Sequence, residues 1–144
     1  MIEKDTIRLL RECDAGVKMG ISSLDDVLPS VQSEQLKRTL STCRDEHDKL
    51  EREIRGHLDR FGDEGKAPNP MARGMSAMKT DMELAMDRSD ARVAAMITDG
   101  CNMGVKSLSQ YLNQYAAADE FSKDIAKRLI ALEDTLAKDI RGFL

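Results

Sequence analysis

The chain has 144 residues, enough for one domain with a sizeable buried core. Hydrophobic residues make up 41% and charged residues 33%, whereas aromatic residues are only 3% and Trp is absent. A β-rich fold normally contains more aromatic and β-branched residues, so this composition favours helices. The formal net charge is −4, and its 22 basic and 26 acidic residues are interspersed without a basic stripe or an acidic tail. We therefore expect an all-α protein that binds no nucleic acid.

Targeting and redox signals point to the cytoplasm. Residues 1–6 lack the apolar stretch of a signal peptide, and no run approaches the roughly 18 apolar residues of a membrane span. The three cysteines Cys13, Cys43 and Cys101 include no CxxC pair, and an odd number argues against a disulfide framework or a zinc site. We expect buried thiols in a reducing compartment and no membrane partner.

The first half of the chain predicts a helical hairpin over about residues 5–61. Apolar residues at spacings of three and four predict a helix over 5–28, which Pro29 ends. A second helix is predicted over 33–61. Its apolar seam also contains one histidine, and the seam consists of Leu36, Leu40, Cys43, His47, Leu50, Ile54 and Leu58.

A connection over about residues 62–87 follows, beginning with a stretch that contains Gly and Pro. Within it a short helix is predicted over 70–86, with a methionine stripe that consists of Met71, Met75, Met78, Met82 and Met86. Flexible Met side chains suit the irregular gaps beneath a crossover segment. The alternative is a partner-binding face, like an amphipathic helix recognised by another protein.

The second half, about residues 88–144, predicts another hairpin. One helix is expected from Asp87, as its N-cap, to about Ala116, and the last from about Asp119 to the C-terminus. Their apolar seams are Val93, Ile97, Cys101, Val105, Leu108 and Leu112, and then Ile125, Leu129, Leu132, Leu136, Ile140 and Phe143. Short connections within each hairpin make its helices antiparallel neighbours. The chain is therefore expected to be a single four-helix-bundle domain, residues 1–144.

The two hairpins resemble each other in sequence. Residues 16–28 align with 100–112, and residues 47–58 align with 133–144. Identical residues in the first block include Gly16, Met19, Gly20 and Leu24, which match Gly100, Met103, Gly104 and Leu108. Because apolar seam maps onto apolar seam, the pattern predicts a duplicated helical hairpin.

Each half contains a Gly-x-x-x-Gly, Gly16/Gly20 and Gly100/Gly104. A glycine inside a helix costs about 1 kcal/mol relative to alanine, so some gain must offset it. We expect close approach of the first and third main helices at these glycines, by the logic of small-residue packing. The alternative is room for a ligand at the same crossing.

His47 and Glu133 take equivalent positions in the repeat, where the seam otherwise has Leu, and Asp14 and Glu46 are expected near them. A buried charge is costly unless it is paired. Three interpretations remain open. The first is a hydrogen-bonded pair, with or without Asp14, that sets helix register. The second is one metal ion held by His47, Glu133 and one or both of the other carboxylates. The third is acid–base chemistry on a bound small molecule.

The hairpin–crossover–hairpin plan resembles the ferritin-like superfamily. More narrowly, segments 12–20, 46–47, 68–71 and 98–108 resemble an uncharacterised family of small bacterial ferritin-like proteins, and the likeness covers nearly the whole chain. The resemblance implies a fold and no established reaction. A di-iron site of this superfamily uses Glu-x-x-His on two helices. Here Arg44 stands where the Glu before His47 is needed, and Leu136 where the His after Glu133 is needed.

We therefore expect a non-enzymatic ferritin-like bundle without a cofactor, which acts by forming a homodimer or by binding an unknown protein partner. The alternative is a ferritin-like protein that binds iron or another divalent metal at the middle of the bundle. The residues of that alternative site are His47, Glu133, Asp14 and Glu46.

Overall fold

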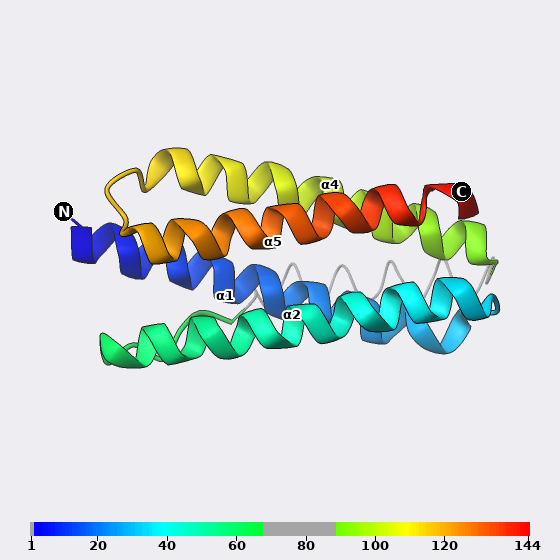
Figure 1. The fold of residues 1–144 in the computed structure, drawn as a ribbon, viewed down its shortest axis with the longest axis horizontal. Helices are drawn as coiled ribbons and strands as arrows, with labels where there is room; N and C mark the ends of the chain where they lie inside the picture. The colour runs from blue at the N-terminus through cyan, green and yellow to red at the C-terminus, as the bar shows by residue number, and fades with distance from the viewer. Residues whose placement is uncertain (1, 68–88) are drawn as a thin grey trace.

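The structure is a computed structural model that describes residues 2–67 and 89–144 (Figure 1). The short helix predicted over 70–86, with its methionine stripe, lies outside the described residues. Within them the chain is all-helical, with four long helices and no strand. The helices are α1 (Ile2–Val27), α2 (Glu34–Arg60), α4 (Asp90–Gln114) and α5 (Glu120–Asp139). Two 3₁₀ turns, η1 (Leu28–Ser30) and η2 (Arg141–Phe143), follow α1 and α5.

Polar N-caps start three of these helices. The Ser33 side chain accepts a hydrogen bond from the Leu36 amide, and the Asp119 side chain accepts one from the Ser122 amide, so both helices begin where the sequence predicted a helix start. At α4 the cap is Ser89, which accepts from the Arg92 amide at 3.2 Å, so the predicted cap at Asp87 is corrected by two residues. The last helix ends at Asp139 rather than at the C-terminus.

The four helices pack as a bundle of two antiparallel hairpins, α1 with α2 and α4 with α5 (Figure 1). Across the hairpins, α1 lies against α4 and α5, and α2 lies against α5. Helix α2 ends and helix α4 begins at opposite ends of the bundle, so these two helices run in the same direction (Figure 1). No helix in residues 2–67 or 89–144 combines the length and the apolar character that a membrane span requires.

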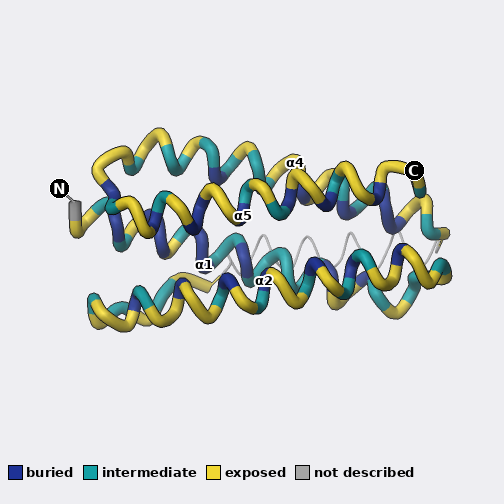
Figure 2. Tube along the Cα trace, in the orientation of Figure 1, coloured by how far each residue is buried: buried dark blue, intermediate teal, exposed yellow. Residues whose placement is uncertain are grey.

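The inner faces of the helices form a buried stripe (Figure 2). All seven predicted seam residues of α2 are buried, including His47. The seams of α4 and α5 are confirmed less completely, because Val105, Leu112, Leu132 and Phe143 are only half-buried. In α1, Ile7 and Ile21 are half-buried as well. The 3.6-residue period therefore predicted which face of each helix turns inward, but not how deeply each residue of that face is buried.

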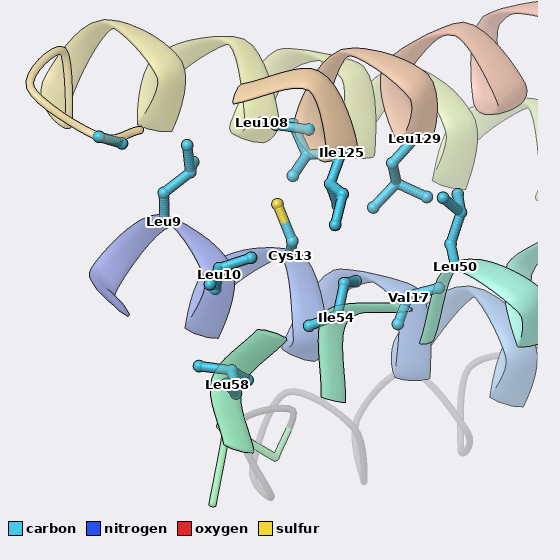
Figure 3. Packing of buried hydrophobic residues seen from close by; sticks show 12 residues of the cluster. Leu9, Leu10, Cys13, Val17, Leu50, Ile54, Leu58, Leu108, Ile125 and Leu129 are labelled. Carbon is cyan, nitrogen blue, oxygen red and sulfur yellow. The ribbon is translucent and has the colours of Figure 1, made fainter. Parts of the chain in front are cut away.

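The apolar core divides into two clusters along the bundle. Figure 3 shows the first, in which Leu9, Cys13, Ile54 and Ile125 point into a common interior. The second lies toward the other end and includes Leu24, Leu36, Leu40, Ile97 and Ile140. Half-buried Leu132 packs against both clusters. Between the two clusters each helix also places one glycine or one polar residue on its inner face, and these four residues form the candidate site.

Candidate functional site

One residue from each helix contributes to a polar layer at the middle of the bundle. We call Gly20 of α1, His47 of α2, Gly104 of α4 and Glu133 of α5 the central layer. His47 and Glu133 are 2% and 7% exposed, and each lies along its helix between residues of the two apolar clusters. The central layer therefore interrupts a continuous hydrophobic core and is nearly closed to solvent.

The two glycines make space for the two polar side chains. A Cβ at Gly20 would lie 2.7 Å from His47 Nε2, and a Cβ at Gly104 would overlap the Glu133 carboxylate. Gly16 instead faces Leu129, and a Cβ at Gly100 would meet no described atom within 4 Å. The expectation that all four glycines mark one close approach of α1 and α4 is thus corrected. Two of them accommodate a polar side chain from the neighbouring helix of the same hairpin.

The histidine ring is oriented by its own helix. His47 Nδ1 lies 2.8 Å from the Cys43 carbonyl oxygen, which can only accept, so Nδ1 carries a hydrogen and donates it. Nε2 then points at Glu133, with 3.8 Å between Nε2 and Oε1. This separation exceeds the roughly 2.7–3.2 Å of an N–H···O hydrogen bond. His47 and Glu133 therefore face each other, but the direct hydrogen bond of the first interpretation is not formed.

Both facing groups are short of partners. His47 Nε2 and Glu133 Oε2 are buried without a hydrogen bond among the described residues. Burial raises the pKa of the Glu133 carboxyl, and the facing His47 offsets part of that shift. Because Nδ1 is committed to Cys43, a neutral His47 beside an ionised Glu133 would set two acceptors against each other. The pair therefore places two polar atoms in the core that no described residue satisfies.

The structure does not bring Asp14 to the central layer. Asp14 is buried, but its Oδ2 accepts from Lys18 Nζ at 2.8 Å and from the Lys66 amide at 3.0 Å. A Cβ at Gly65, which has φ +86°, would overlap this carboxylate. Asp14 thus anchors the segment that leaves α2 and returns along α1. Its level along the bundle is that of the first apolar cluster.

Glu46 is exposed and pairs with Lys49 at 3.3 Å on the outside of α2. Of the four predicted metal ligands, only His47 and Glu133 therefore face each other. In the described part of the chain, no group of three or more His, Cys, Asp or Glu side chains is arranged to hold a metal ion. The residues present do not assemble the predicted four-ligand set.

The open surface between α2 and α5 is hollowed along the outside of the central layer. Two adjoining hollows of about 400 and 380 Å³ share Glu46, Leu132 and Thr135. We call this surface the outer groove. Apolar side chains from both helices line it, namely Cys43, Leu50, Ala131, Leu132 and Leu136. The charges beside them are Arg38, Glu46, Lys49, Glu53, Arg128 and Asp139.

One interaction network at the end of the bundle was missed by the sequence reasoning. His57 Nε2 lies 3.2 Å from Asp119 Oδ2, and the His57 ring contacts the Phe121 ring in a tilted arrangement with 4.3 Å between centroids. The Asp119 amide also donates to Thr6 Oγ1 at 2.8 Å. These contacts tie three helices together near the start of α5. The apolar period of a helix does not predict these contacts, because the partners are far apart in sequence.

The fold and the central layer define an all-α four-helix protein whose core carries one buried histidine–glutamate pair. Comparisons with models of protein families, with curated proteins and with solved structures each found no match.

Proposed function

We propose that this chain is a non-enzymatic helical bundle that acts by associating with another protein chain through the outer groove. The observation that carries the proposal is the contrast between two sites. The polar pair is shut inside the bundle, with His47 only 2% exposed, whereas the outer groove is open at the surface, where half-buried Leu132 and exposed Ala131 lie among charged side chains. Apolar area surrounded by polar groups is typical of a protein-binding surface.

In this proposal the central layer has a structural role. Sliding one helix along its neighbour by a turn would place His47 or Glu133 against an apolar cluster and leave a polar group buried without compensation. A polar position in an otherwise apolar seam selects one register, as a buried Asn does in coiled coils. The central layer therefore specifies how the two hairpins align, and it holds the outer groove in shape.

We also propose that the bundle is ferritin-like and arose from a duplicated hairpin, as its resemblance to the bacterial family implies. The support is that each hairpin pairs one glycine with one polar side chain, Gly20 with His47 and Gly104 with Glu133. In addition, the chain between α2 and α4 has to connect opposite ends of the bundle (Figure 1), as a ferritin-like crossover does. The three free, buried cysteines fit a cytoplasmic location.

The association proposal is tested by placing a photo-cross-linking amino acid at Thr135, in the outer groove. The matched control has the same amino acid at Arg52, which is exposed on α2 outside the groove. Irradiation of the producing cells is expected to give a covalent adduct of higher mass from position 135 and not from position 52. Adducts from neither position, or equally from both, would rule out association through this groove.

Metal binding is the second candidate function, and one observation favours it. His47 Nε2 and Glu133 Oε2 are both buried and unpartnered among the described residues. Imidazole and carboxylate together are ligands for a divalent cation such as iron. The test is the metal content of the gently purified protein, with His47→Ala and Glu133→Ala beside the parent and Asp134→Asn as the control. Stoichiometric metal that is lost only in the first two variants supports this candidate. Metal absent from the parent after aerobic loading with iron excludes it.

A further inference from the structure

We propose that the chain bound in the outer groove is a second copy of this protein, related by a two-fold axis that runs parallel to the helices. This inference rests on the proposed function and names the partner of the same groove. The geometry that points to a second copy is the placement of four charged side chains around the apolar residues that line the outer groove.

The four charges form an alternating rectangle. Arg38 of α2 and Asp139 of α5 border one end of the groove. Glu53 of α2 and Arg128 of α5 border the other end, where Arg128 Nη1 and Nη2 lie 2.9 and 3.0 Å from the two Glu53 oxygens. Each helix thus presents one positive and one negative corner, in opposite order, because α2 and α5 are antiparallel (Figure 1).

An alternating rectangle is complementary to itself. A two-fold axis parallel to the helices lays α2 of one copy over α5 of the other without changing the level along the bundle. Arg38 then faces Asp139 of the second copy, and Glu53 faces Arg128 of the second copy. Two copies of one surface meet in this way in an isologous dimer. Charge complementarity of this kind orients partners and excludes other registers.

Glu46 and Thr135, at the middle of the groove, favour this axis over a two-fold axis that lies perpendicular to the helices. An in-plane two-fold perpendicular to the helices would also match the corners, but it would lay α2 over α2 and set Glu46 against Glu46 of the second copy. Like charges directly opposed are destabilising. With the axis parallel to the helices, Glu46 instead faces Thr135 of the second copy. Half-buried Leu132 and exposed Ala131 then lose contact with water.

Sedimentation velocity over a concentration series tests the dimer. The parent is expected to sediment as a dimer. Arg38→Asp and Asp139→Arg are each expected to raise the dimer dissociation constant about tenfold, and combining them is expected to restore it. The matched control is Arg52→Asp, an equal charge change outside the groove, which is expected to leave the constant unchanged. A parent that is monomeric throughout, or a double variant weaker than either single one, overturns the proposal.

A mixing experiment tests the axis. Glu46→Cys and Thr135→Cys proteins are oxidised separately and together. A disulfide dimer from the mixture alone is expected, because α2 meets α5 of the other copy. A dimer from Glu46→Cys alone would show α2 against α2 and overturn the proposed axis. The photo-adduct from Thr135 distinguishes failure of the dimer proposal from failure of the proposed association through the outer groove. An adduct of twice the chain mass supports self-association, one with a different protein leaves only the association function standing, and no adduct removes both.

Discussion

His47 and Glu133 face each other at the centre of the bundle with 3.8 Å between Nε2 and Oε1, and each occupies space that a glycine leaves free. This arrangement explains why Gly20 and Gly104 lie inside α1 and α4 despite the poor helix propensity of glycine. It also divides the core into two apolar clusters. The predictions below follow from these contacts.

Gly104→Ala is expected to lower the free energy of unfolding by about 1–3 kcal/mol, because the added methyl overlaps the Glu133 carboxylate. Gly20→Ala should behave similarly through its contact with His47. The control is Gly56→Ala on α2, where no described atom lies within 4 Å, and it should stabilise by about 0.4–1 kcal/mol. Urea unfolding measures all three. A Gly104→Ala protein as stable as Gly56→Ala would contradict the account of the central layer.

Most of the fold was predictable from the sequence, because one period of apolar residues defines each buried face. The seam of α2, including His47, was predicted residue by residue and is buried throughout. The level of a side chain along the bundle was not predictable in the same way. Asp14 was expected near His47, but it binds the Lys66 amide in a segment that returns along α1. The apolar pattern of α1 does not predict where that segment lies, since its position depends on tertiary contacts.

Glu133→Gln is expected to change the pH dependence of stability. Burial raises the carboxyl pKa in the folded state above its usual value of 4.5. From pH 4.5 up to the raised value, the unfolded chain therefore holds fewer protons than the folded chain, and stability falls as pH rises. Gln does not ionise, so the stability of the variant relative to the parent should increase with pH across that window. Unfolding free energies at several pH values measure the difference.

The control for Glu133→Gln is Asp134→Asn, which alters the next, exposed carboxylate. Comparing the two variants over the same pH range isolates the contribution of the buried carboxyl group. A flat difference for Glu133→Gln would mean that Glu133 ionises in the folded protein as it does in water.

Asp119→Ala is expected to destabilise the protein by about 0.5–2 kcal/mol, because it removes the N-cap of α5. Burial alone would raise the pKa of Asp119, but hydrogen bonds from Ser122 and His57 lower it overall. A lowered folded pKa contributes stability above the usual value of 3.8 that is lost as pH falls through the folded value. The cost of Asp119→Ala should therefore shrink in acid. The cost of Ser89→Ala, which removes the neutral cap of α4, should not shrink.

The three thiols are expected to resist alkylation in the folded protein. Burial raises the pKa of Cys13, Cys43 and Cys101 to about 12, so few thiolates exist at neutral pH. Mass spectrometry after iodoacetamide treatment should find the folded chain unmodified and the urea-unfolded chain modified at all three positions. Rapid labelling of any one cysteine in the folded state would place that thiol at an accessible, activating site.

The central claim is that the buried pair builds the bundle while the outer groove makes the contact. The measurement that tests it most directly is the photo-adduct yield from Thr135 in two variants, Leu132→Asp and the double variant His47→Gln/Glu133→Gln. Circular dichroism confirms beforehand that both variants are folded. Leu132→Asp is expected to abolish the adduct, whereas the double variant is expected to keep it, because its Gln side chains keep uncharged polar groups at both central positions and so keep the helix register. An adduct that survives Leu132→Asp but disappears in the folded double variant would contradict the account and place the function at the buried pair.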